Sequence, residues 1–600
     1  MTAPKVVAAI DFGTYGTGYA WTEVEGEEGS LRAHRSEPIY RDRWPGSDSP
    51  YPKDLSAVLL NQGGQVIAWG HQAKREWARL SQDGGGAGYT YAAGFKMALK
   101  ADAYHGLGAP GTGSARIDSV AQAYPLVVSY LRRVSEMARQ EITESSYLDS
   151  QIRWCLTVPA IWDEPEKQLM RKAAAEAGLP ADRDRLLLAL EPEAAAVYCR
   201  HHLARLVGSD ASERDHAELG TRFLVADCGG GTVDITAFQL VPDSYGELRL
   251  LESGKVSGGK LGSEYINEEF FRHVLAARLG GPELLERLRR ESPYGLLELM
   301  DRWESAKVTA QVTLTSNGPV IERPIYLSVP GEIHDLLPDS AVSALAAQPG
   351  GSRHRMVVTP QEAAQVFDRV IDSIIEEILT QLTDMNAQAR PQDPPATILL
   401  VGGLSGSEYL RARLRYILDA QPAPLGLTRI LVPANPAAAV LFGAVRYACD
   451  PPVRSRLAPY TYGCKFFPPF EPGIDEPGRR FTEDGVTRCR NRFKIFVAKG
   501  TKLEAGHQVT EGMTPVYADR QQMELIFYRS PEREPRYIDG PGAQVIGTLT
   551  IALGAALQLP LAEREVQVQL SFGDTDISAV AVNLRTGERL ETVLRFTRPD

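Results

Sequence analysis

Phe223-Leu-Val-Ala226 is a short apolar run that leads into the turn Asp227-Cys-Gly-Gly-Gly-Thr232, and the run Val233-Asp-Ile-Thr-Ala-Phe-Gln-Leu240 follows it. Apolar segments on both sides of a glycine-rich turn predict a strand, a tight turn and a second strand. The same design stands near the start of the chain, where Lys5-Val-Val-Ala-Ala-Ile10 leads into Asp11-Phe-Gly-Thr-Tyr-Gly-Thr-Gly18. Two copies of one hairpin predict an internally duplicated fold with two lobes.

Helical and strand-like segments alternate around these two hairpins. Strands are predicted to end at Thr157-Val-Pro-Ala160 and at Thr397-Ile-Leu-Leu-Val401. Helices are predicted over the ranges 119–141, 164–177, 264–279, 282–310, 359–382 and 408–418. This alternation is typical of the α/β class. We expect the two-lobed unit to extend over residues 1–450.

The sequence changes character after Asp450-Pro-Pro452. Residues 451–492 hold the proline-rich run Phe466-Phe-Pro-Pro-Phe-Glu-Pro-Gly473 and are predicted to form a linker and connecting segment. From residue 493 onward, apolar and polar residues alternate with period two between turn residues, as in Val566-Gln-Val-Gln-Leu-Ser-Phe572. This pattern predicts a C-terminal β-sandwich over residues 493–600.

The composition excludes several classes of protein. With 43% hydrophobic and 24% charged residues among 600, the chain can bury a core and is not globally disordered. A formal net charge of −11 argues against nucleic-acid or anionic-membrane binding through bulk charge. No apolar run is long enough for a membrane span, and the run before Asp11 is too short for a secretory signal. The six cysteines show no C-x-x-C pair, so we expect reduced thiols in a cytoplasmic protein.

The chemistry of both hairpins points to phosphate. Glycine lets a backbone approach a phosphate closely, successive N–H groups form an anion-binding nest, and an aspartate at the end of the strand can hold a hydrated cation. Asp11-Phe-Gly-Thr14 alone also fits an ordinary hairpin turn. The three consecutive glycines between Asp227 and Thr232 are harder to explain structurally. Two such turns facing each other would grip a polyphosphate from both sides.

A third glycine turn, Val401-Gly-Gly-Leu-Ser-Gly-Ser407, follows an apolar strand and precedes a predicted helix. Such a turn can lie flat against a nucleoside, although Gly-Gly is common in turns of this kind. The run Gly254-Lys-Val-Ser-Gly-Gly-Lys260 is close to a P-loop. Leu261 stands where Ser or Thr would have to reach the metal, which excludes a P-loop NTPase.

Five segments stand in the order of a known superfold: Asp11 to Gly18, Leu190-Glu-Pro-Glu-Ala-Ala-Ala196, Asp227 to Thr232, Val401 to Ser407, and Asn435-Pro-Ala-Ala-Ala-Val-Leu-Phe-Gly443. They resemble the first phosphate loop, first connecting helix, second phosphate loop, adenosine loop and second connecting helix of the actin and hexokinase type of ATPase. The stretch from Thr157 to Gly178 and the tail are similar to the heat shock protein 70 family within this superfold. The resemblance runs from Val6 to about Leu590 and implies a two-lobed, actin-like ATPase fold.

The resemblance implies a role for each motif residue. Asp11 and Asp227 would hold Mg²⁺ through water, and Asp227 would also orient the attacking water. Thr232 would reach the γ-phosphate, Glu191 would bind water of the metal shell, and Lys96 would be the catalytic lysine. The implied contacts with ATP or ADP are made by Asp11, Gly13, Thr14, Tyr15, Gly229, Gly230, Gly231, Thr232, Glu304, Lys307, Gly402, Gly403, Leu404 and Ser405.

Plainer interpretations stand beside several of these roles. Glu191 fits a solvated carboxylate stabilised at a helix start, and Lys96 fits an ordinary surface lysine. Glu304 and Lys307 are three residues apart on one helix face, which suits a ribose and equally a surface ion pair. Val308 replaces an arginine that stacks on adenine in the family, so weaker nucleotide binding is expected.

Pro159 and Lys167 resemble a relay between the domains in the family, and Val453 to Gly463 replaces the family's apolar linker. The helical lid that follows the sandwich in the family is not recognised. The resemblance therefore implies a lidless, ATP-dependent chaperone of the stress response that acts on unfolded or extended polypeptides, with co-chaperones left open. A small-molecule kinase on the same fold and a nucleotide-gated scaffold without hydrolysis are the alternatives.

Overall fold

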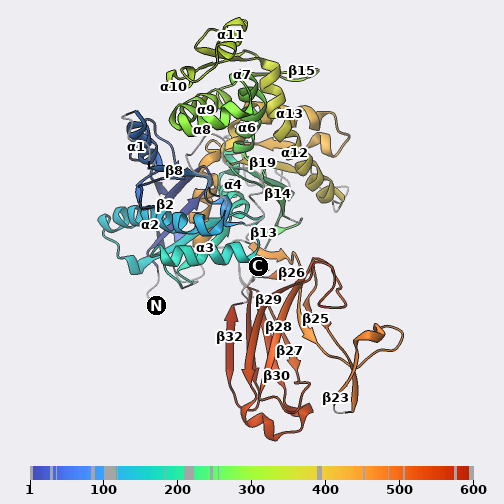
Figure 1. Ribbon diagram of the computed structural model, residues 1–600. Helices are drawn as coiled ribbons and strands as arrows, with labels where there is room; N and C mark the ends of the chain where they lie inside the picture. Colours follow the sequence, from blue (N-terminus) through green and yellow to red (C-terminus); the bar gives the residue numbers. More distant parts are fainter. Residues whose placement is uncertain are drawn as a thin grey trace. The chain divides into compact units, whose positions relative to one another are not determined.

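The computed structural model (Figure 1) describes residues 4–26, 31–34, 37–82, 88–100, 117, 119–182, 184–207, 222–242, 248–254, 256–387, 389, 395–450, 453–483, 485–504, 507–572 and 577–593. The chain divides into two compact units. The first comprises Met1–Trp162, Leu169–Leu240 and Val256–Pro452, and the second comprises Asp163–Gln168, Val241–Lys255 and Val453–Asp600. The mixed helices and strands of the first unit confirm the predicted α/β class.

The first lobe of the larger unit is built on the N-terminal hairpin. Strand β1 (Val6–Phe12) pairs antiparallel with β2 (Gly16–Glu25), and β9 (Ile152–Val158) and β10 (Leu186–Leu190) continue the sheet in parallel. Every residue of β1 and β9 is buried, as expected for strands covered on both faces. Helices α2 (Val120–Glu144) and α3 (Glu164–Glu176) contribute apolar residues to this core.

The second lobe repeats this order. Strand β11 (Arg222–Cys228) pairs antiparallel with β12 (Val233–Pro242), and β19 (Thr397–Val401) and β20 (Arg429–Leu431) follow in parallel. Helices α12 (Pro360–Ala387) and α13 (Glu408–Asp419) cover this sheet with apolar side chains. The two lobes thus present equivalent hairpins at equivalent places in their sheets.

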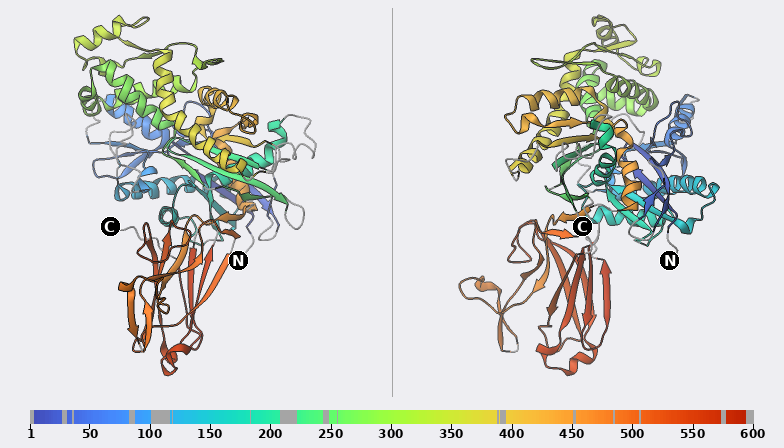
Figure 2. Two further views of the ribbon diagram at one scale, coloured as in Figure 1. Left: turned by 90° about the vertical axis from the view of Figure 1, so that its right-hand side faces the viewer. Right: turned by 180° about the vertical axis from the view of Figure 1, so that it is seen from behind.

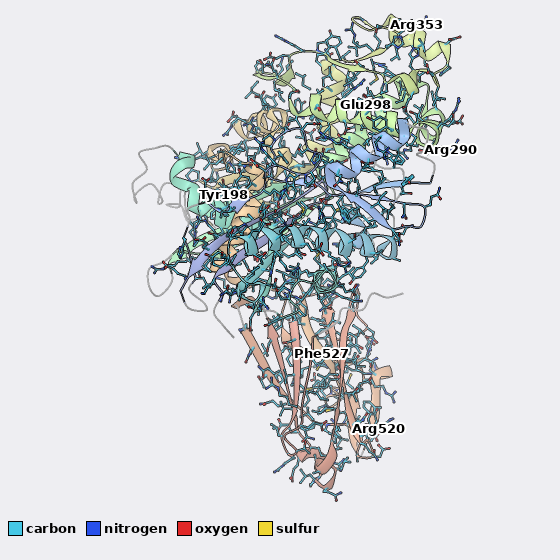
Figure 3. The ribbon with its side chains drawn as sticks, turned by 90° about the vertical axis from the view of Figure 1, so that its left-hand side faces the viewer. Tyr198, Arg290, Glu298, Arg353, Arg520 and Phe527 are labelled. Atoms are coloured by element: carbon cyan, nitrogen blue, oxygen red, sulfur yellow. The ribbon has the colours of Figure 1, made fainter. Side chains whose placement is uncertain are left out.

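Two helices join the lobes at close range. Helix α4 (Glu191–Val207) follows β10, and α14 (Ala439–Cys449) lies across it. A Cβ atom on Gly443 would lie 1.8 Å from the carbonyl oxygen of Ala194, so only glycine permits this crossing. Tyr198 of α4, which Figure 3 labels, packs its ring 6.0 Å from that of Phe442.

One helix prediction was wrong. The range 282–310 holds two helices, α8 (Pro282–Glu291) and α9 (Pro293–Val308), rather than one. Pro293 has no N–H to donate and occupies the first turn of α9, where that loss is tolerated. The range 264–279 begins as α6 (Ser263–Glu269), passes through a π-helical turn at Phe270–Leu275, and ends as α7 (Ala276–Leu279).

Smaller elements complete this unit. They are β3 (Arg32–Ala33), β4 (Ile39–Tyr40), β5 (Asp54–Leu55), β6 (Ala57–Leu60), β7 (Val66–Trp69), α1 (Gly70–Gln82), β8 (Thr90–Ala93), β14 (Ser257–Gly259), β15 (Val312–Thr315), β16 (Gly318–Ile321), β17 (Ile325–Ser328), α10 (Gly331–His334), α11 (Asp339–Ala347) and β18 (Arg355–Val358). Within the described ranges, no helix is long and apolar enough to cross a membrane.

The second unit is rich in antiparallel strands, visible in both views of Figure 2. One sheet has the order β25-β22-β28-β29 and the other the order β27-β30-β31-β32. Their bounds are β22 (Thr461–Phe466), β25 (Arg492–Val497), β27 (His507–Met513), β28 (Gln522–Ser530), β29 (Gln544–Ala552), β30 (Val566–Phe572), β31 (Ile577–Asn583) and β32 (Arg589–Val593). Both sheets share one apolar core, which includes Phe527, labelled in Figure 3.

The segment 451–492, expected to be a connection, contains regular structure. Strand β22 pairs with both β25 and β28, so the first sheet already begins at Thr461. Strands β23 (Arg480–Glu483) and β24 (Val486–Cys489) form a hairpin, and β21 (Val453–Leu457) pairs with β13 (Leu248–Glu252) and β26 (Lys502–Glu504). These strands were not predicted, because the prolines of the segment weaken the strand signal in the sequence. Residues 594–600, at the end of the predicted β-sandwich, lie outside the described residues.

Candidate functional site

The two glycine turns have the same local geometry. The Gly13 N–H donates to the Gly16 carbonyl at 3.1 Å, and the Gly229 N–H donates to the Thr232 carbonyl at 3.0 Å. Each hydrogen bond therefore closes a turn of four residues, 13–16 and 229–232, and leaves the N–H groups at the tip of the turn outside the strand ladder. These turns end strands β1 and β11, whose apolar residues are buried throughout.

The structure brings the two turns against each other. A Cβ atom on Gly230 would lie 2.7 Å from the Cβ atom of Tyr15, and one on Gly231 would lie 2.6 Å from the Thr14 hydroxyl oxygen. Any larger residue at either position would have to displace the first turn. Tyr15 remains 43% exposed, so its ring does not fill the core.

Buried carboxylates stand where these turns begin and end. Asp11 is the last residue but one of β1, Asp227 is the last residue but one of β11, and both are almost completely buried. Asp234 in β12 is directly opposite Asp227 in the ladder and is fully buried. Like charges opposite each other destabilise a sheet, and such arrangements gather at functional sites. Asp234 was not among the predicted site residues, although an acidic residue inside an apolar strand, two positions after Thr232, was a usable signal.

The hydrogen bonds of these carboxylates are incomplete. Asp11 Oδ1 accepts from the Thr157 hydroxyl at 2.8 Å, and Asp234 Oδ1 accepts from the Ile161 N–H at 2.9 Å. The Thr232 hydroxyl also hydrogen-bonds to Asp234. Among the described residues, Asp227 Oδ1 and Asp234 Oδ2 are buried without a hydrogen-bond partner. Such oxygens fit a cation with its water shell or another hydrogen-bond donor.

Burial shifts the protonation of this cluster. Desolvation, followed by the charges of Glu191 and Asp234, raises the pKa of Asp227 well above its usual value, while Lys53 opposes the shift. Desolvation also raises the pKa of Asp234. For Glu191, desolvation outweighs the attraction of Lys96 and raises the pKa to about 7. A cation entering the cluster would therefore be strongly stabilised.

Two lysines accompany the carboxylates. Lys96 Nζ lies 2.7 Å from Glu191 Oε1, and both side chains are buried. The alternative of a surface lysine at Lys96 is therefore wrong, as is that of a solvated carboxylate at Glu191. Lys53 Nζ lies 2.6 Å from Asp11 Oδ2. Lys53 was not among the predicted site residues, since it lies in none of the glycine-rich or acidic motifs of the sequence.

Glu304 and Lys307 pair with each other rather than projecting freely. Lys307 Nζ lies 2.6 Å from Glu304 Oε2 and also donates to Ser263 and Asn267. Lys307 is only 3% exposed, so the alternative of a surface ion pair is wrong for its ammonium group. Burial and the nearby Glu304 raise the pKa of Glu264 to about 7. Val308, the next residue of α9, is 60% exposed.

The third glycine turn lies against the second hairpin. Gly402 has φ 83°, and a Cβ atom on it would lie 2.4 Å from Asp227 Oδ1. Gly403 begins a 3-10 turn that ends at Gly406, with Leu404 and Ser405 buried inside it. The Ser405 hydroxyl donates to the Val401 carbonyl and is thus engaged within the turn.

The residues that follow the P-loop-like run Gly254 to Lys260 also contact this site. The Ser263 N–H donates to the Gly229 carbonyl at 3.0 Å, and the Glu264 N–H donates to the Gly230 carbonyl at 2.9 Å. A Cβ atom on Gly262 would lie 2.2 Å from the Gly230 carbonyl oxygen. Residues 262–264 therefore contact the carbonyl groups of the second turn. This role was not predicted from the sequence. Pro159 follows β9 directly, and Lys167 lies on α3.

The described residues contain no group of three His, Cys, Asp or Glu side chains arranged to hold a metal directly. The expectation that Asp11 and Asp227 hold Mg²⁺ through water stays a prediction.

No family model matches the chain. It is 29% identical to human heat shock 70 kDa protein 12B, over 99% of this chain and 91% of that protein. It is 27% identical to human heat shock 70 kDa protein 12A, over 98% and 91% of the two chains. A chaperone protein HscA homolog of Neisseria meningitidis is 30% identical over 28% of this chain. These similarities confirm the resemblance that the motifs indicated: the chain is similar over almost its whole length to heat shock 70 kDa proteins 12A and 12B, of the divergent branch of the heat shock protein 70 family.

Proposed function

We propose that the larger unit binds ATP with Mg²⁺ between the two glycine hairpins and hydrolyses it slowly. The observation that carries the proposal is the contact between the hairpins, made beside buried carboxylate oxygens that have no hydrogen-bond partner among the described residues. Phosphoryl transfer depends mainly on positioning and charge stabilisation, and this site is built for both.

The hairpins supply the phosphate contacts. Gly13, Gly230 and Gly231 carry no side chain, so their backbone can approach the β- and γ-phosphates closely. The Thr232 hydroxyl, now bonded to Asp234, is close enough to the turn to be shared with a γ-phosphate oxygen. Asp11 and Asp227 would hold hydrated Mg²⁺, which when bound neutralises phosphate charge.

Asp227 would bind the attacking water, and Glu191 would exchange protons. Asp227 Oδ1 accepts a hydrogen bond from the attacking water, because it is a buried acceptor without a partner among the described residues. Glu191, with a pKa of about 7, exchanges protons near neutral pH, and Lys96 holds its carboxylate in place. On the adenosine side, Gly402 and Gly403 face the nucleoside, while Lys307 holds Glu304 in position for the ribose.

The second unit would bind unfolded or extended polypeptides as a β-sandwich, with strand-like hydrogen bonds to the peptide backbone. The two sheets with their shared core support this role. Among the described residues from 453 onward, the helical segments are the short turns η8 (Pro477–Arg479), η9 (Gly554–Gln558) and η10 (Leu561–Glu563). We propose that this part of the unit binds peptides without a helical cover. The buried thiols of all six cysteines suit a reducing compartment, and we place the protein in the cytoplasm.

A turnover assay on the purified chain tests this function. Asp227→Asn removes a carboxylate charge of the site, and Thr232→Ala removes the hydroxyl. Asp335→Asn is the matched control, since the Asp335 side chain is 85% exposed. Phosphate release should fall much more than ATP binding in both site variants and stay unchanged in the control. Parent rates in both site variants would contradict the assigned roles.

The same experiment separates the alternatives. ATP binding without any phosphate release would favour a nucleotide-gated scaffold. ATP consumption that requires an added small molecule and yields its phosphorylated form would favour a kinase. Similarity to the 12A and 12B proteins over almost the whole chain, second unit included, favours the chaperone.

A further inference from the structure

The Lys53 side chain reaches the site by passing over Gly16 and Gly18 of β2. Lys53 precedes β5, which pairs antiparallel with β2 at Gly16 and Thr17. A Cβ atom on Gly16 would lie 3.1 Å from Lys53 Cβ, and one on Gly18 would lie 3.3 Å from Lys53 Cγ. The aliphatic stem therefore lies over two positions without side chains. This path lets its ammonium group reach Asp11 Oδ2 at 2.6 Å, with the side chain only 16% exposed.

The two hairpins differ at one equivalent position. In the second hairpin, Asp234 stands opposite Asp227 in the ladder. In the first hairpin, Gly18 stands opposite Asp11, and the Lys53 stem packs beside it. The fold thus places a second anion beside one aspartate and a cation beside the other.

The charge of Lys53 is retained inside the site. The Asp11 carboxylate lies 2.6 Å from the ammonium group, and an opposite charge at this distance favours the charged form of the lysine. An ammonium group has three donors, and Asp11 is its hydrogen-bond partner among the described residues. Donors therefore remain for the oxygens of an incoming polyphosphate.

We propose that Lys53 is a built-in counter-ion, which shares the Asp11 carboxylate with the hydrated cation of the proposed site and donates to a phosphate oxygen when a nucleotide binds. The inference rests on the proposed nucleotide site and adds a property to it. Nucleotide binding by this chain should depend only weakly on Mg²⁺, because part of the required positive charge is covalently attached.

Calorimetric titration with ADP, in Mg²⁺ and in excess chelator, tests the proposal without any turnover. For the wild type, chelation should weaken ADP binding by less than about tenfold. In Lys53→Met, which keeps the stem and removes the charge, ADP binding in chelator should weaken about 10- to 100-fold further, the effect of one charge-assisted hydrogen bond. Lys53→Arg should behave as the wild type. Lys172→Met is the matched control, because its ammonium group is exposed and lies 3.8 Å from Glu176.

The outcomes distinguish a failure of the role of Lys53 from a failure of the proposed nucleotide site. Strong Mg²⁺ dependence in the wild type, or equal Mg²⁺ dependence in the wild type and Lys53→Met, would overturn the role of Lys53 and leave the nucleotide site standing. No ADP binding by the wild type in either condition would overturn the proposed function itself. If Lys53→Met fails to fold, the double variant Asp11→Asn with Lys53→Met removes both buried charges. It should show the same loss relative to the single variant Asp11→Asn, and no loss would overturn the proposal.

Discussion

Gly402 is the position where one added methyl group tests the geometry of the site most sharply. Its φ of 83° lies in the left-handed region, where a residue with a Cβ atom costs about 1–2 kcal/mol. The added Cβ atom would also lie 2.4 Å from Asp227 Oδ1 and 2.5 Å from the Cys228 carbonyl oxygen. Relief of such overlap typically costs about 1–3 kcal/mol. Gly402→Ala should therefore lower the free energy of unfolding by about 2–5 kcal/mol.

Gly406→Ala is the matched control for this variant. Gly406 is exposed in the same 3-10 turn, and a Cβ atom there would meet nothing within 4 Å. Denaturant unfolding of both variants gives the stability difference, and ATP titration reports the displacement of Asp227. The variant Gly402→Ala should bind ATP more weakly than Gly406→Ala. Equal stabilities within about 0.5 kcal/mol would refute the reasoning that Gly402 presses on Asp227.

Three further perturbations address other parts of the account. Gly443→Ala should destabilise the larger unit in thermal unfolding, because the added Cβ atom would overlap the Ala194 carbonyl between α4 and α14. The control variant Gly478→Ala should unfold as the wild type does, because a Cβ atom there would meet nothing within 4 Å. The pKa of Glu264 is raised from 4.5 to about 7, so the folded state binds a proton that the unfolded state has released, and stability is lost as pH rises across this window. In denaturant unfolding at several pH values, Glu264→Gln should lose less stability than the wild type between about pH 5 and pH 8, and parallel curves would contradict the assignment. A fluorescent extended peptide should leave the second unit quickly in both ATP and ADP, and slow release in ADP that ATP strongly accelerates would show coupling to a cover.

The hairpins could be predicted because their signals are local. Strand, glycine turn and strand follow one another within a few residues, as at Asp227 to Thr232, and the structure places both turns as mutual neighbours. Asp234 and Lys53 could not be found in the same way. Asp234 matters because the ladder sets it opposite Asp227, and Lys53 because β5 pairs with β2 near Gly18.

The hydrogen-bond partners of two site side chains could not be predicted from the sequence either. Ser405 stands in a motif typical of nucleoside contact, yet its hydroxyl is bonded to the Val401 carbonyl. Lys307 was predicted to contact a ribose or to form a surface ion pair, yet Ser263 and Asn267 of a different helix accept hydrogen bonds from its buried ammonium group. Spacing along one helix cannot report partners that tertiary packing supplies.

Binding of ATP to the purified wild-type chain would decide whether the two hairpins form a nucleotide site. Calorimetric titration with ATP and Mg²⁺ should show one saturable site per chain, with GTP weaker. The same ligand should raise the thermal midpoint of the larger unit, since a ligand at about 100 times its Kd stabilises the folded state by about 2.7 kcal/mol. No heat of binding and an unchanged midpoint at millimolar ATP would contradict a nucleotide site between the two hairpins.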